Sequence, residues 1–228
     1  MRWAHPTKGL LGPGAFIALA EERGIVASIG RWVLHEACQQ ARRWQDEFPE
    51  RPLAMHVNLS GKQLGQPELV GEVARALEAA RLDPSLLVLE MTETVLLEDS
   101  QATVARLQQL KALGIRLAID DFGTGYSSLN YLRQVPIEIL KIDKAFVDGV
   151  AKGTEAAALA HAVIRLCHTL RLRAIAEGVE QARQAAELLA LGCHEAQGYH
   201  FGRPAPAEEI GRLLRRDPAA LPVTEVGR

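Results

Sequence analysis

Short apolar runs alternate with longer amphipathic segments along most of this 228-residue chain. Such alternation is typical of repeated βα units that build a parallel sheet. We expect strands at residues 53–59, 86–92, 116–121, 137–142, 173–177 and 195–201. Apolar residues at helical spacing predict helices at residues 16–22, 32–44, 67–80, 100–113, 155–170, 182–191 and 207–215.

A polar side chain lies at or near the end of every expected strand. These residues are, in chain order, Asn58, Glu90, Asp120, Lys141, Glu177 and Gln197. In a (β/α)8 barrel the carboxyl ends of the strands build the active site, with each residue coming from a different strand. We therefore predict an α/β fold of the modified (β/α)8, TIM-like barrel type. A doubly wound open sheet also binds ligands at this edge, but its Gly-rich dinucleotide fingerprint is absent from the first βα turn.

The run from Asp120 to Ser128, DDFGTGYSS, follows the apolar stretch 117–119 directly. Adjacent strand residues point to opposite faces, so the two carboxylates can share a target only where the strand ends and the backbone bends. A Gly/Ser/Thr-rich loop after paired acids favours divalent cations held by oxygen ligands, with a phosphate nearby. An acidic turn after a strand is the alternative interpretation.

The composition, 48% hydrophobic and 24% charged, fits one globular domain, which we expect to span residues 1–214, with a flexible tail at 215–228. A formal net charge of −2 argues against binding a nucleic-acid polymer. Cys38, Cys167 and Cys193 form no CxxC pair, which favours reduced thiols in a cytoplasmic protein. No apolar stretch has membrane-spanning length.

Taken together, the strand-end motifs resemble the successive motifs of the EAL domain. They occupy residues 2–6, 57–60, 89–93, 120–128, 140–143, 176–180 and 197–199, in unbroken order. The resemblance implies a phosphodiesterase, dependent on Mg²⁺ or Mn²⁺, that linearises the bacterial second messenger cyclic di-GMP to pGpG.

The resemblance also implies a two-metal site. Asn58, Glu90 and Asp120 match ligands of the first metal ion, and Asp120 would bridge to a second ion held with Asp121 and Glu177. Two divalent ions about 4 Å apart can activate water and stabilise phosphoryl oxygens. A single strand-end carboxylate is more often paired or capping, but several together repel one another without a cation.

Further roles follow from the same resemblance. Lys141 matches a lysine that holds the attacking water or helps to take its proton, and a structural ion pair is the alternative. Glu93 matches a glutamate that anchors the loop 122–128, although an acid in a first helical turn would also be stable there. Glu180 and Gln197 match catalytic positions near the substrate and the attacking water.

Three remaining features complete the expected site. Asp143 matches a supporting acid beside Lys141 on the substrate side, and Arg2 matches a phosphate-contacting arginine. Glu180, Gln197 and Asp143 could instead be surface or capping groups, and Arg2 could be frayed at the terminus. No pair of histidines has ligand spacing, so we expect His5, His56 and His161 to be structural.

The Glu-Ala-Leu run that names the family precedes Arg-Trp by one residue, and here Met1 holds that intervening position. We therefore expect a barrel that lacks its first one or two strands and one glutamate ligand. The alternative function is a catalytically impaired cyclic di-GMP-binding module. A metal-dependent barrel of the enolase type is a third candidate, which Asn58 and the run 120–128 disfavour. Expected partners are cyclic di-GMP, a second copy in a homodimer, and fused sensory or GGDEF domains.

Overall fold

The computed structural model describes residues 1–94, 101–123, 132, 134–150 and 155–215. Within these ranges the chain forms two compact units by its internal contacts. Unit 1 comprises residues 1–90 and 99–116, and unit 2 comprises residues 91–98 and 117–228. The expected tail from residue 216 onward lies outside the described residues.

The strands follow the expected βα alternation. An N-terminal hairpin pairs β1 (Trp3–His5) with β2 (Gly9–Leu11). The strands of the larger sheet are β3 (Met55–Asn58), β4 (Leu87–Thr92), β5 (Arg116–Phe122), β6 (Ile139–Ile142), β7 (Arg173–Ala176) and β8 (Glu195–Ala196). Their hydrogen-bonded order runs from β3 to β8 in sequence. A doubly wound sheet reverses its strand order at a switch point, so this sequential order confirms the barrel-type prediction over that alternative.

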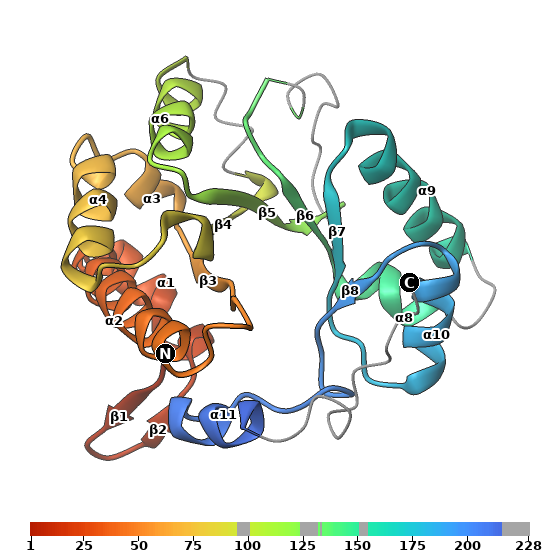
Figure 1. Ribbon diagram of the computed structural model, residues 1–228, viewed down its shortest axis with the longest axis horizontal. Coiled ribbons are helices and arrows are strands. Elements are labelled where there is room, and N and C mark those ends of the chain that lie inside the picture. The colour runs from red at the N-terminus through yellow and green to blue at the C-terminus, as the bar shows by residue number, and fades with distance from the viewer. Residues whose placement is uncertain (95–100, 124–131, 133, 151–154, 216–228) are drawn as a thin grey trace. The chain divides into compact units, whose positions relative to one another are not determined.

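The helices of unit 1 cover its pair of parallel strands. They are α1 (Ile17–Glu22), α2 (Val26–Glu47), α3 (Gly61–Leu64), α4 (Leu69–Ala80) and α6 (Gln101–Ala112), with 3₁₀ turns at Pro13–Ala15 and Pro84–Leu86. Helix α2 packs on α4 and β3 (Figure 1). Leu34, Cys38, Val57, Val73 and Leu87 are buried in this unit. Their burial is the main source of stability here, at about 25 cal/mol per Å² of apolar surface.

In unit 2, helices lie beside strands β6, β7 and β8 (Figure 1). They are α8 (Lys144–Val150), α9 (Glu155–Leu170) and α10 (Ala182–Ala190), and α11 (Ala207–Leu214) comes last in the chain. Helix α8 packs on α9 and α10. Leu140, Ile142, Val147, Ile164 and Ala176 are buried. The β6 burial pattern is continuous, as expected for a parallel strand covered on both faces.

The expected strand at residues 195–201 is wrong beyond Ala196. From Gln197 the backbone turns over Val179, since Val179 N–H donates to Gln197 O at 3.0 Å and His200 N–H donates to Val179 O at 3.0 Å. A Cβ at Gly198 would lie 2.1 Å from Val179 O, so this close approach requires glycine. The hairpin strands, α3 and α8 were not expected, because each is too short to show a clear period.

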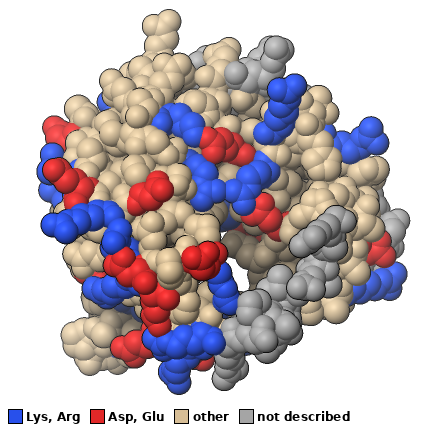
Figure 2. Space-filling view, in the orientation of Figure 1, with Lys and Arg blue, Asp and Glu red and all other residues tan. Residues whose placement is uncertain are grey.

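Acidic and basic side chains are interspersed on the face drawn in Figure 2. This distribution agrees with a sequence that holds 26 basic and 28 acidic residues. Among the described helices, none combines the length and the apolar character that crossing a membrane requires.

Candidate active site at the strand ends

Three carboxylates converge in unit 2. One oxygen from each of Asp120, Asp121 and Glu177 lies within 4.8 Å of the others. The pairing register of β5 with β6 shifts between Ile119 and Phe122, and Asp121 adopts a left-handed φ of 54°. This irregularity explains how two adjacent side chains of one strand reach the same cluster.

Lys141 lies inside this cluster. Its Nζ is 2.8 Å from Asp120 Oδ1 and 2.5 Å from Glu177 Oε1, and only 4% of its side chain is exposed. Strand β6 pairs with both β5 and β7, so it carries the lysine between the two acids. The buried ammonium offsets the repulsion between the carboxylates. The structural ion pair, which was the alternative interpretation of Lys141, is therefore present. It also holds Lys141 Nζ beside the carboxylates, where proton transfer is feasible.

The environment raises the pKa of the Asp121 carboxyl above its ordinary value. Desolvation is the largest cause, followed by the negative charges of Asp120 and Asp143, whereas Lys141 acts in the opposite direction. Ionisation of Asp121 is thus less favourable here than for an ordinary aspartate, and added positive charge would favour its ionised form.

Gln197 contacts the acidic cluster through one of its members. Its Nε2 donates a hydrogen bond to Glu177 Oε1 at 2.5 Å. Parallel pairing of Ala176 with Ala196 places the two residues that follow them side by side. The structure therefore brings Gln197 to the site, as a partner of Glu177.

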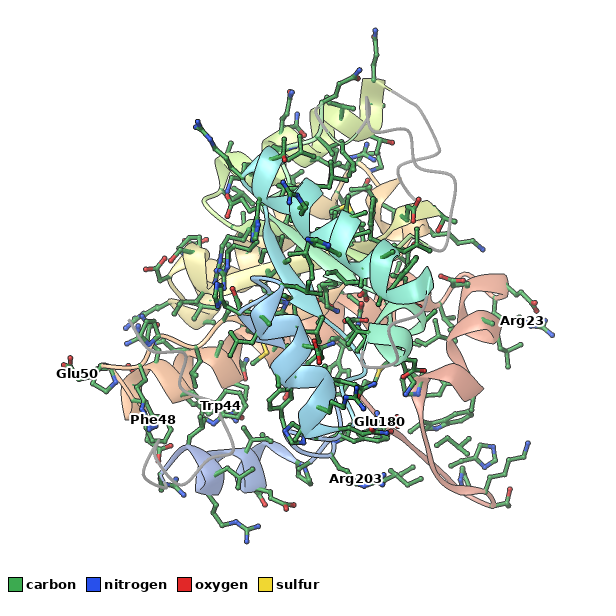
Figure 3. All side chains as sticks on the ribbon, turned by 90° about the vertical axis from the view of Figure 1, so that its right-hand side faces the viewer. Arg23, Trp44, Phe48, Glu50, Glu180 and Arg203 are labelled. Carbon is green, nitrogen blue, oxygen red and sulfur yellow. The ribbon has the colours of Figure 1, made fainter. Side chains whose placement is uncertain are left out.

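Glu180 is not one of the three clustered carboxylates. It lies in the connection before α10 (Figure 3), and its Oε1 is 2.5 Å from Lys144 Nζ. The buried Gln184 side chain accepts hydrogen bonds from the Glu180 and Gln181 backbone N–H groups, at 2.8 and 2.9 Å. Sequence analysis identified neither Lys144 nor Gln184. The partner of Lys144 is 36 residues away in the sequence, and Gln184 bonds to backbone N–H groups.

Two further predicted residues lie at the edges of α8 and β4. Asp143 Oδ1 accepts a hydrogen bond from Ala145 N–H at 2.7 Å at the start of α8, which is a capping role. Asp143 is also close enough to Asp121 to raise its pKa. Buried Glu93 accepts a hydrogen bond from Gly123 N–H at 2.9 Å. Residues 124–128 of the loop that Glu93 is expected to anchor lie outside the described residues.

The remaining predicted ligands are in unit 1. Asn58 and Glu90 are direct register partners on the parallel strands β3 and β4. Glu90 is buried, and its Oε1 lies 2.6 Å from His56 Nδ1. Sequence analysis predicted a structural role for His56. Its i, i+2 relation to Asn58 nevertheless places both residues on one strand face. Residue spacing in the sequence could not identify Glu90, on the neighbouring strand, as the partner of His56.

Arg2 is exposed near the N-terminal hairpin, and its Nη1 donates to Met1 O at 2.8 Å. It lines a cavity of about 320 Å³ in unit 1 together with Trp3, Phe16, Leu19 and Trp32. The surroundings of Arg2 within this unit are mainly apolar, so its expected phosphate contact stays a prediction.

The acidic cluster fits a divalent metal ion. Its three acids offer only oxygen donors, which Mg²⁺ and Mn²⁺ prefer. The position of Lys141 against two of them indicates that these carboxylates stabilise a cation. Asn58 and Glu90 supply donors of the same chemical kind in unit 1.

Most of the chain is similar to proteins of one known family. The EAL domain family matches residues 1–204. The chain is 45% identical over 210 residues to the bifunctional diguanylate cyclase/cyclic di-GMP phosphodiesterase MucR of Pseudomonas aeruginosa, covering 92% of this chain and 30% of MucR. It is 42% identical over 230 residues to the cyclic di-GMP phosphodiesterase NbdA of the same organism, covering all of this chain and 29% of NbdA.

A solved structure, the PaMucR phosphodiesterase in complex with c-di-GMP, superposes with a TM-score of 0.87 at 45% identity. The match covers 92% of this chain and 84% of that one. Against the curated relatives the chain spans less than a third of their full length, 30% for MucR and 29% for NbdA. By its matched residues, its strand order and its structural similarity, the chain belongs to the EAL domain family.

Proposed function

We propose that the chain is a metal-dependent phosphodiesterase that hydrolyses cyclic di-GMP to linear pGpG in bacterial second-messenger signalling. The observation that carries this proposal is the convergence of Asp120, Asp121 and Glu177 around Lys141. The names of MucR and NbdA, and the ligand of the MucR structure, support the choice of substrate.

The proposed cofactors are two Mg²⁺ or Mn²⁺ ions. Asp120, Asp121 and Glu177 would hold one, and Asn58 and Glu90 would join Asp120 at the other. Such ions, when bound, supply activation of water and stabilisation of charge on the phosphoryl oxygens. The raised pKa of Asp121 agrees with this assignment, because a nearby cation would offset the desolvation and the negative charges that raise it.

In the proposed reaction a water oxygen bonds to phosphorus and one P–O3′ ester bond breaks, which leaves the phosphate on the 5′ side of pGpG. Lys141 would orient the water, and in its neutral form, which bound metal ions would favour over the ammonium, it would help to take the proton. Gln197 would orient Glu177, to which it donates a hydrogen bond. Glu180 would act beside the substrate, with Arg2 and Asp143 on the substrate side and Glu93 holding the backbone at Gly123.

A cyclic di-GMP-binding module without turnover is the second candidate. The contacts of Lys141 with Asp120 and Glu177 favour it, since the ammonium already neutralises part of the cluster without a metal ion. Such a module would bind the nucleotide in the presence of a chelator, whereas hydrolysis would depend on the divalent ion.

The wider setting is proposed from the family resemblance. Residues 1–214 would act as one barrel domain with a tail at 215–228, in the cytoplasm and beside sensory or GGDEF domains of a longer protein. A homodimer is also proposed. Light scattering coupled to size-exclusion chromatography tests the oligomeric state, and a monomeric mass at all concentrations would contradict the dimer.

The test of the enzymatic function uses the purified chain, cyclic di-GMP and Mn²⁺, with chromatographic detection of pGpG. We expect turnover that stops when EDTA is added and is absent from Asp121→Asn. The control Asp46→Asn removes an exposed acid on α2, paired with Arg42, and should keep wild-type turnover. Binding without turnover would replace the first proposal by the second, and absence of both would refute the two.

A further inference from the structure

His56 and Glu90 form a short contact between neighbouring strands of unit 1. Parallel pairing of β3 with β4 sets His56 opposite Val88 and Asn58 opposite Glu90. The imidazole therefore lies two residues before Asn58 on the same strand face. Its Nδ1 is 2.6 Å from Glu90 Oε1, a distance that requires a hydrogen bond between the two groups.

The two partners differ in their exposure. The Glu90 side chain is 6% exposed, and that of His56 is 30% exposed. A buried carboxylate that lacks hydrogen bonds is costly, so Glu90 depends on donors from its surroundings. A carboxylate that binds a metal ion is ionised and can only accept, so in that state Nδ1 is the donor in this pair. The bond fixes one carboxylate oxygen, Oε1, on the His56 side.

The same strand face borders open space. His56 and Asn58 both line a cavity of about 500 Å³ in unit 1, with Val33, Ser60 and Gln63 among its other lining residues. A small ligand such as a hydrated cation can therefore reach Asn58 without any rearrangement of the unit 1 core. The hydrogen-bonded His56 lies beside that approach.

We propose that His56 is a positioning residue that holds the Glu90 carboxylate in the orientation in which Glu90 and Asn58 together bind a divalent cation. This inference rests on the metal site of the proposed function. Groups that hydrogen-bond to metal-binding carboxylates orient them and tune their affinity, and their loss typically lowers metal affinity 10–100-fold. His56 acts through Glu90 and has no direct contact with the reacting atoms.

The test measures Mn²⁺ affinity by titration calorimetry in the absence of nucleotide. We expect His56→Leu to weaken one Mn²⁺ site by about 10–100-fold, and His56→Asn to restore part of it because its amide can donate to the carboxylate. His161→Leu, a substitution at an exposed histidine of α9 in unit 2, should leave the affinity unchanged. Unchanged Mn²⁺ affinity in folded His56→Leu would overturn the proposal, and a lowered melting temperature alone would show a structural role.

A double variant separates action through Glu90 from direct ligation. In a Glu90→Gln background, we expect His56→Leu to cause no further loss of Mn²⁺ affinity. Electron spin echo spectroscopy of the Mn²⁺ complex, with ¹⁵N-labelled histidine, should show no coupling to imidazole nitrogen. Such a coupling would make His56 a ligand and overturn the positioning role. If the wild-type chain hydrolyses cyclic di-GMP but His56→Leu keeps full Mn²⁺ affinity, only this inference fails; a wild-type chain that binds no Mn²⁺ refutes both.

Discussion

In unit 1 a single buried carboxylate, Glu90, meets an imidazole, whereas in unit 2 three carboxylates converge around one ammonium. One acid in a buried site can be stabilised by a hydrogen-bond donor whose charge is optional. Three acids within 4.8 Å repel one another, so they need a full positive charge. The difference indicates that the contact in unit 1 orients the Glu90 carboxylate, whereas the cluster in unit 2 requires positive charge to be stable.

The largest effect is expected for Lys141→Met, which removes the ammonium that contacts Asp120 and Glu177. Hydrolysis of cyclic di-GMP should fall by about 10²–10⁴-fold, the usual contribution of a proton-transfer group. The metal-free variant should also lose about 3–5 kcal/mol of unfolding free energy, because buried acids lose their partner. Mn²⁺ should raise its melting temperature more than that of the wild type.

Lys8→Met, at an exposed lysine in the N-terminal hairpin region, is the matched control for Lys141→Met. It should change neither turnover nor the response of the melting temperature to Mn²⁺. Equal Mn²⁺ responses in Lys141→Met and the wild type would contradict the role of Lys141 as the internal counter-ion of the cluster.

Asp121→Asn should separate stability from metal binding. The raised pKa of folded Asp121 gives a stability contribution that is present below its unfolded pKa of about 3.9 and is lost as the pH rises through the folded pKa. Asparagine has no such loss, so the metal-free variant should become more stable than the wild type as pH increases. We expect this gap in melting temperature to be larger at pH 7 than at pH 3.5.

Thermal melts in EDTA from pH 3.5 to pH 7 measure this gap, and Mn²⁺ should reverse its sign at pH 7. A gap that is independent of pH would show that ionisation of Asp121 has no cost in the folded state. That result would weaken the contrast between the two units. The ionised acids of the cluster would then cost no more in the folded state than ionised Glu90 does.

Cysteine labelling can compare the opening of the units. Burial raises the pKa of Cys38 in unit 1 to about 11 and that of Cys167 in unit 2 to about 12. The thiolate is the reactive form, so native labelling at neutral pH should be at least about a hundredfold slower than that of a free thiol. Mn²⁺ should slow Cys167 more than Cys38, as followed by peptide mass spectrometry; equal slowing would indicate that the units open together.

The smallest effect is expected for Arg173→Ala. Arg173 and Glu195 join β7 to β8 by an ion pair of 2.5 Å, but their side chains are 47% and 41% exposed. Exposed pairs contribute about 0–1 kcal/mol, so denaturant unfolding should change little and turnover should be retained. A loss as large as that of Lys141→Met would show that the buried position of Lys141 is not what makes its pairs strong.

Sequence periodicity predicted the elements that are long or continuously apolar. The expected helix at 155–170 coincides with α9, and the expected strand at 116–121 is β5 apart from Phe122. Helix α8 was missed because its seven residues are too few to show a clear period, although capping was the alternative interpretation of Asp143. His56 was missed because its partner Glu90 is 34 residues away, a contact that only the strand register creates.

The backbone at Asp121 also limits which acids can serve there. Its φ of 54° belongs to a region that asparagine, aspartate and glycine tolerate far better than other residues. Glutamate, the usual conservative replacement for an acid, would keep the charge but strain the backbone at this irregularity of β5 and displace its carboxylate by one methylene. Of the residues that adopt this left-handed conformation readily, only aspartate supplies a carboxylate, so position 121 has no conservative substitute.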